Sequence, residues 1–229
     1  MVKRVGNQTI LLENTGVLSS SGVVGKKEGE GPLKEAFDMI YEDEYLGQET
    51  FEAAESMLVK NAIGFALEKV GKSADEIDLA LSGDLLNQCM ASTYGIKDFG
   101  FAHIGLFGAC STCALSCGLG ALLVETGVAN TVVAATSSHF CTAERQFRFP
   151  LEYGSKCAPT SQHTVTGAGA FVLSKNDNSP KIKAVTFGKV KDFDITDANN
   201  MGAAMAPPCV IMRPKNKHCQ NSISCVEIC

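Results

Sequence analysis

The sequence predicts an α/β fold in which a helical layer lies between two sheets. Strand-like segments without a polar face alternate with helix-like segments, which indicates a mixed or parallel sheet covered on both faces. The segment from Cys110 to Gly127 has almost no polar face, and this is typical of a helix buried between layers. A chain of 229 residues, 45% of them hydrophobic and 20% charged, is long and apolar enough to form a packed core.

The elements follow from periodicity and from glycine and proline positions. We expect a short strand over 9–12, a loop through 19–31 and a helix from Pro32 to Ile40. A longer helix over 51–70 has apolar residues at three- and four-residue spacing and ends at Gly71. The remaining elements are a strand over 77–82, a helix over 85–94, the apolar helix over 110–127, and strands over 101–107, 131–135, 164–173 and 182–190.

Charge and hydropathy exclude several classes of protein. The net charge of −5 argues against a nucleic-acid-binding surface, which normally appears as a basic stripe. No apolar run reaches the roughly 18–20 residues that cross a bilayer, and the first residues lack the apolar region of a signal peptide. We therefore expect a chain that is made in the cytosol and binds no nucleic acid.

The last 22 residues, 208–229, differ from the rest of the chain in composition. Four of the ten cysteines fall there, with three basic residues and one acidic residue. The spacing of His218, Cys219, Cys225 and Cys229 fits no standard zinc pattern, so a metal site is the less favoured interpretation. A frameshift or gene-model error explains the break better, and we expect this tail to be disordered.

The turn that contains Cys110 carries the strongest chemical signal. A cysteine that opens a helix directly after a strand meets unpaired backbone N–H groups and the positive end of the helix dipole. Both favour a thiolate nucleophile, and the same N–H groups could hold a carboxylate ligand. The alternative is a small buried residue. Cys113 and Cys117 lie on the same helix face, where core thiols are a better interpretation than a metal site.

Polar groups gather at three further places. Asp84 follows a strand and either faces a pocket or caps the next helix. His139 follows the strand over 131–135 and either contacts a ligand or is a solvated loop residue. Arg145 and Arg148 belong to a charged, aromatic loop that either binds carboxylates or forms a surface or dimer contact.

Taken together, several motifs closely resemble the stage V sporulation protein AD family of endospore-forming bacteria. The resemblance covers about residues 7–207. The residues that carry it are Lys27–Leu33, Gly83–Gln88, Phe107–Thr112, Ala135–His139, Thr142–Arg148, Glu152–Gly154 and Met201–Pro207.

The resemblance implies a thiolase-like, layered αβαβα fold made of two similar halves. Residues 1–178 would form the N-terminal half, 179–207 the start of the C-terminal half, and 208–229 the aberrant tail. It also implies binding of dipicolinic acid, free or with calcium, during sporulation and germination. The setting would be the spore inner membrane, as a peripheral component beside other stage V sporulation A proteins. No cofactor is implied except calcium bound together with dipicolinate.

Carried over by motif, Cys110 matches the position of the thiolase nucleophile, and its pocket is expected to hold the ligand. Thr112, Asp84, His139, Arg145 and Arg148 are the further expected ligand-binding residues. Because the second half of a thiolase-like chain stops soon after it begins, a homodimer that covers the exposed layer is also expected. The alternative function is an acyltransferase in which the Cys110 thiolate attacks a thioester, with His139 and His163 as the visible candidate bases.

Overall fold

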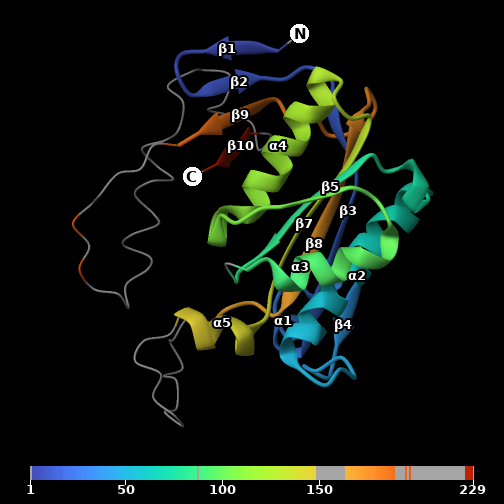
Figure 1. Ribbon diagram of the computed structural model, residues 1–229, viewed down its shortest axis with the longest axis vertical. Coiled ribbons are helices and arrows are strands. Elements are labelled where there is room, and N and C mark those ends of the chain that lie inside the picture. The colour runs from blue at the N-terminus through green and yellow to red at the C-terminus, as the bar shows by residue number, and fades with distance from the viewer. Residues whose placement is uncertain are drawn as a thin grey trace.

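The computed structural model describes residues 2–86, 88–147, 163–188, 194, 196 and 225–228, with 144–147 and 225–228 described by their backbone. These residues form a six-stranded sheet and a four-stranded sheet with helices between and outside them (Figure 1). This is the layered α/β architecture that the sequence predicts.

The six-stranded sheet is mixed. Its strands lie in the order β4-β3-β8-β7-β5-β6, and β8 runs antiparallel to both of its neighbours, whereas β7, β5 and β6 are parallel to one another. The carboxyl ends of β5 and β7 therefore meet at one edge. The bounds are Thr15–Gly25 for β3, Met39–Tyr41 for β4, Leu79–Asp84 for β5, His103–Gly105 for β6, Thr131–Ser138 for β7 and Gly167–Lys175 for β8.

The four-stranded sheet joins the two ends of the chain. Its order is β1-β2-β9-β10, with β1 at Lys3–Val5, β2 at Thr9–Leu11, β9 at Ala184–Phe187 and β10 at Cys225–Ile228. β10 pairs in parallel with β9. Four residues of the segment expected to be disordered thus form a strand, and the rest of that segment, 208–224 and 229, lies outside the described residues.

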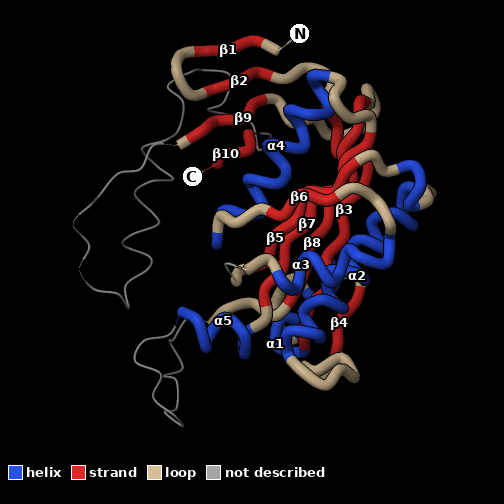
Figure 2. The backbone as a smooth tube through the Cα atoms, viewed as in Figure 1, coloured by secondary structure: helices blue, strands red, loops and turns tan. Residues whose placement is uncertain are grey.

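Two helices cover one face of the six-stranded sheet (Figure 2). α2 spans Phe51–Val70; the Thr50 hydroxyl accepts a 3.1 Å hydrogen bond from the Ala53 amide, and Gly71 ends the helix in the left-handed conformation. α3 spans Met90–Ile96 and is followed by the 3₁₀ turn η3, Lys97–Phe99. Buried apolar residues of α2, β7 and β8 form one core, including Leu58, Ile63, Val133 and Val172.

α4, Thr112–Thr126, lies between the two sheets (Figure 1). Gly120 permits this close approach, because a Cβ atom there would lie 3.0 Å from Leu173 and 3.1 Å from Val132. The second core combines α4 with both sheets, including Leu12, Leu81, Ala121, Val124, Leu173 and Val185. The predicted helix between two sheets is confirmed.

The same helix corrects one expectation from the sequence. The segment Ala109–Thr126, with a mean hydropathy of 1.4 over its 18 residues, reaches the length and apolar character of a membrane span, which the sequence reading had excluded. Its packing between sheets accounts for that apolar character without a bilayer.

Several other expectations are wrong. The expected helix over 85–94 begins only at Met90, and part of the expected loop that contains Arg145 is the helix α5, Phe140–Phe147. The loop over 19–31 is instead the second half of the long strand β3, followed by the short helix α1 at Lys26–Gly29. The helix over 32–40 is a single 3₁₀ turn, η1 at Lys34–Ala36, and the strand β4, which pairs in parallel with β3. The remaining short elements are η2 at Ala74–Glu76, η4 at Ala109–Ser111 and α5 at Phe140–Phe147.

Candidate functional site

Cys110 lies in the 3₁₀ turn η4, immediately before α4, and is exposed. The turn is sharp because Ala109 adopts a left-handed backbone conformation with φ of 46°, which is unusual for a residue with a Cβ atom. No side chain caps the N-terminus of α4 at Ser111. An accessible thiol therefore stands beside the positive end of the α4 dipole, as the sequence predicts.

Two hydroxyl groups hold this turn in place. Thr112 Oγ1 donates to the carbonyl of Ala109 at 2.9 Å and accepts from the amide of Gly108 at 3.1 Å. Ser111 Oγ donates to the carbonyl of Gly108 at 2.7 Å. Thr112 is fully buried, so its hydroxyl positions the turn and faces no solvent.

The two other cysteines of α4 differ in environment. Cys117 is buried, which confirms the prediction of a core thiol, whereas Cys113 is exposed, which corrects it. A hydrogen bond with Cys117 lowers the pKa of Cys113 to about 7. The same bond, with burial, raises the pKa of Cys117.

Asp84, the last residue of β5, is fully buried. Its Oδ2 accepts hydrogen bonds from the amide and the hydroxyl of Ser92, both at 2.9 Å. Asp84 therefore holds the first turn of α3, but it does not cap a helix from Leu85 onward as the alternative had it, because α3 begins at Met90 after Cys89. Its Oδ1 has no hydrogen-bond partner within the described part of the chain.

A second buried carboxylate, Glu55 of α2, lies near Asp84. Its two oxygens accept from Ser137 Oγ at 2.8 Å and from Thr142 Oγ1 at 3.0 Å. Burial raises the pKa of Glu55 to about 7; the two hydroxyl bonds oppose this shift, and the charge on Asp84 adds to it. Sequence analysis did not single out Glu55, although its spacing from Val59 and Ala62 puts it on the apolar face of α2.

His139 is also fully buried. Its Nδ1 accepts from the Cys141 amide at 3.2 Å, and its Nε2 therefore donates to the carbonyl of Glu44 at 2.9 Å. The ring of Phe51 lies 5.0 Å from the imidazole. Both ring nitrogens are thus engaged within the protein, so neither the solvated-loop alternative nor an open ligand contact describes this residue.

The sheet separates the predicted ligand-binding residues into two groups. Side chains alternate along β5, and Gly83 faces Thr112 at the start of α4, whereas Asp84 faces Ser92 and Glu55 of the α3 and α2 layer. Asp84 belongs with His139, on the opposite face from Cys110. Arg148 lies outside the described residues, as does the side chain of Arg145, whose backbone is part of α5.

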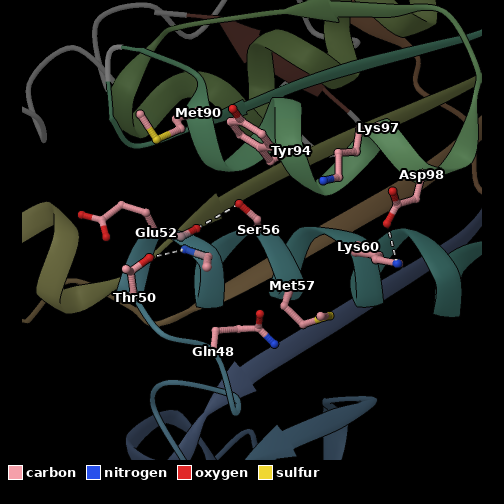
Figure 3. Close-up of a pocket in the computed structure, with 11 residues that line it drawn as sticks. Gln48, Thr50, Glu52, Ser56, Met57, Lys60, Met90, Tyr94, Lys97 and Asp98 are labelled. Atoms are coloured by element: carbon pink, nitrogen blue, oxygen red, sulfur yellow. Dashed lines mark hydrogen bonds and ion pairs between the residues drawn. The ribbon is translucent and has the colours of Figure 1, made fainter.

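A pocket of about 430 Å³ lies between α2 and α3, on the face away from α4 (Figure 3). Met57 and Met90 provide apolar walls. Lys60 pairs with Asp98 at 2.7 Å, and Lys97 Nζ lies 5.4 Å from the centre of the Tyr94 ring. The sequence reading missed this pocket, because its lining comes from the exposed flanks of two helices and from no motif.

Among the described residues, no group of three or more His, Cys, Asp or Glu side chains could hold a metal ion. Glu55 and Asp84 form a pair of carboxylates with hydroxyl neighbours and do not meet that condition.

The arrangement of helices and strands defines a thiolase-like protein. The structure resembles that of 3-oxoacyl-[acyl-carrier-protein] synthase III from Aquifex aeolicus, with a TM-score of 0.50, 17% identity, and coverage of 72% of this chain and 55% of that chain. It also resembles an OleA variant from Xanthomonas campestris bound with cerulenin, with a TM-score of 0.51, 15% identity, and coverage of 76% and 60%. These likenesses establish the thiolase-like fold.

The sequence identifies the family within this class. The model of the stage V sporulation protein AD family matches residues 6–221. Stage V sporulation protein AD of Bacillus subtilis strain 168 is 42% identical over 207 residues, which are 90% of this chain and 61% of that protein. The chain belongs to the stage V sporulation protein AD family and spans about three fifths of the length of this relative. The family match continues past residue 207, where the sequence reading ended the resemblance.

Proposed function

We propose that this chain binds dipicolinic acid during sporulation and germination, at the turn that contains Cys110. The observation that carries the proposal is the exposed turn at the start of α4, in a chain that belongs to a sporulation protein family. The proposal includes the setting that the resemblance implies, a peripheral position at the spore inner membrane beside other stage V sporulation A proteins.

The chemistry of the ligand suits a helix N-terminus. Dipicolinic acid (pyridine-2,6-dicarboxylic acid) is a small planar dianion at neutral pH, and backbone N–H groups with the positive end of a helix dipole stabilise carboxylates. η4 runs directly into α4, and the amides of Ser111 and Thr112 already donate to the carbonyls of Gly108 and Ala109, so the amides proposed to meet a ligand are those of Ala109 and Cys110. Calcium that enters with the ligand would offset part of its charge.

The geometry narrows the residues that take part. Because the hydroxyl of Thr112 is committed to the turn, the proposed donors are backbone amides around Cys110. Asp84 and His139 support the layer on the other side of the sheet and act on the ligand only indirectly. Arg145 and Arg148 remain the proposed cationic partners.

Isothermal titration calorimetry of the full chain with dipicolinate, with and without calcium, tests the proposal. We expect saturable binding that Thr112→Val weakens at least tenfold, because this substitution releases the turn that presents the backbone amides, whereas Cys110→Ala keeps those amides and should weaken binding less. Lys97→Ala is the matched control, because Lys97 is a cation in the pocket on the other face of the sheet, and this variant should bind as the wild type does. Absence of saturable binding by the folded chain contradicts the proposal, as does loss of binding in Lys97→Ala alone.

The acyltransferase alternative predicts a different result. A Cys110 thiolate that attacks a thioester would leave an acyl group on the chain. Intact-mass measurement after incubation with acyl-CoA should therefore show no stoichiometric adduct if the chain only binds its ligand. A stoichiometric adduct that disappears in Cys110→Ala would favour the enzyme and overturn the proposal of a pure binding function.

A further inference from the structure

The segment Cys110-Ser111-Thr112-Cys113 places two thiols one helical turn apart at the start of α4, and both are exposed. Two cysteines separated by two residues at a helix N-terminus form the arrangement used by dithiol–disulfide proteins. Neither the thiolase-like fold nor the proposed ligand requires the second thiol. The second thiol thus has no role in the fold or in the proposed ligand binding.

The backbone between the two cysteines is held by the intervening side chains. Ser111 Oγ bonds to the carbonyl of Gly108, and Thr112 Oγ1 bonds to the carbonyl of Ala109 and to the amide of Gly108. Residues three apart on a helix have Cβ atoms about 5–6 Å apart. A disulfide needs about 3.5–4.5 Å between Cβ atoms, so a shift of about 1–2 Å at the helix end closes the bond.

The two thiols have different roles in such a reaction. The hydrogen bond with Cys117, one turn further along α4, lowers the pKa of Cys113 to about 7. A larger share of Cys113 is then thiolate at neutral pH than for an ordinary cysteine. Cys117 is buried and stays a thiol, because burial and the neighbouring Cys113 raise its pKa. Cys113 is thus the attacking group, and Cys110 is the accessible thiol that completes the reaction.

We propose that Cys110 and Cys113 form a reversible disulfide, with a small-molecule disulfide of the glutathione type as oxidant. The Cys113 thiolate attacks one sulfur of the oxidant, forming a mixed disulfide and releasing one thiolate. Cys110 then loses its proton to solvent and attacks the Cys113 sulfur, which releases the second thiolate. The chain loses two electrons and two protons, and the oxidant is reduced to two thiols. This inference does not depend on dipicolinate binding.

The test uses the reduced full chain and oxidised glutathione at neutral pH, with the remaining thiols blocked by N-ethylmaleimide under denaturing conditions. We expect intact mass to show two fewer maleimide groups than the reduced chain, and peptide mapping to join Cys110 to Cys113. Treatment with dithiothreitol should restore both thiols. A bond from Cys113 to Cys117, or retention of both maleimide groups, overturns the proposal.

Single variants separate the steps. Cys110→Ser should stop at the mixed disulfide and keep one glutathione on Cys113, and Cys113→Ser should form neither product at the wild-type rate. Cys117→Ala should slow the reaction several-fold at neutral pH but less at pH 9, because Cys113 loses its hydrogen-bond donor. Cys141→Ser, a half-buried thiol elsewhere, is the control and should react as the wild type does. An unchanged disulfide product in Cys110→Ser or Cys113→Ser would show that the assigned pair is wrong.

Discussion

Glu55 of α2 and Asp84 of β5 are both fully buried, and the charge of Asp84 helps to raise the pKa of Glu55. The hydroxyls of Ser137 and Thr142 bond the two oxygens of Glu55, and Ser92 bonds one oxygen of Asp84. This pair joins α2, α3 and the end of β5 on the face of the sheet opposite Cys110. Its protonation therefore affects the stability of the layer that supports the candidate site.

The first prediction concerns the pH dependence of stability. Folding raises the pKa of Glu55 from 4.5 to about 7, so between these values the native state holds a proton that the unfolded state has lost. The stabilising contribution is complete below pH 4.5 and is lost as the pH rises through 7. Glu55→Gln removes this dependence and should be more stable than the wild type at pH 8 by roughly 2–3 kcal/mol, with little difference at pH 4.5.

Urea denaturation at pH 4.5, 6 and 8 measures this effect. Glu68→Gln is the matched control, since Glu68 is exposed on the same helix, and it should keep the wild-type dependence. Asp84→Asn should lower the pKa of Glu55 and shift the transition to lower pH. Parallel stability curves for the wild type and Glu55→Gln would show that Glu55 does not titrate in this window.

The second prediction concerns Glu125, near the end of α4. Its carboxylate accepts hydrogen bonds from the amides of Glu13, Asn14 and Thr15 at 2.9–3.3 Å, and from the side chains of Asn14 and Thr15. These residues connect β2 of one sheet to β3 of the other. In Glu125→Gln, the side-chain NH₂ group faces hydrogen-bond donors and cannot accept from them. This variant should therefore lower the free energy of unfolding by about 1.5–3 kcal/mol at pH 7.

The pH dependence of Glu125 has the opposite sign to that of Glu55. Burial acts to raise its pKa, but the hydrogen bonds from Asn14, Glu13 and Thr15 outweigh burial and lower it below 4.5. Its contribution is present above pH 4.5 and is lost as the pH falls through the lowered pKa. The free energy of unfolding of Glu125→Gln, measured by chemical denaturation, should therefore differ less from that of the wild type at pH 3 than at pH 7. An equal difference at pH 3 and pH 7 would contradict the assignment.

The third prediction compares two helical glycines. A Cβ atom at Gly95 of α3 would lie 2.7 Å from both the Ser56 carbonyl and the Val59 Cβ of α2, so Gly95→Ala should destabilise the chain by roughly 1–3 kcal/mol. Gly64 of α2 has open space around the same position. Gly64→Ala should therefore stabilise the chain by about 0.5–1 kcal/mol. Thermal unfolding of both variants checks the contrast, and a shift of the same sign in both would refute it.

The sequence predicts the parts of the fold whose signal is local. α2 has apolar residues at helical spacing and a glycine at its end, and β5, β7 and α4 have continuous apolar runs. β3 was missed because its run of serines is typical of a loop. In the structure Ser19 Oγ donates to the Ala66 carbonyl at 2.7 Å, and Ser21 Oγ bonds to Ala62. Such contacts with a helix far along the chain leave no pattern in the strand itself.

In the candidate site, too, some features have a local signal in the sequence and others depend on tertiary packing. The position of Cys110 follows from a strand-to-helix boundary that the sequence displays. The separation of Asp84 from Cys110 depends on which face of β5 each residue takes, and a shift of one residue in the strand reverses that assignment. The burial of His139 depends on Phe51 and on the Glu44 carbonyl, which lie more than 80 residues earlier. Tertiary packing decides these features.

The last prediction concerns the support of the Cys110 turn. Thr112→Val keeps the shape of the side chain but removes the acceptor of the Gly108 amide and one donor to the Ala109 carbonyl. We therefore expect the free energy of unfolding to fall by about 1–3 kcal/mol. In Thr112→Val, the hydrogen-exchange rate of the Gly108 amide should rise relative to the wild type. This increase should be at least ten times larger than the increase for amides in α2. Thr112→Ser retains the hydroxyl and should protect the Gly108 amide nearly as well as the wild type does. If the amide exchanges at the same rate in Thr112→Val and Thr112→Ser, the hydroxyl does not hold the turn.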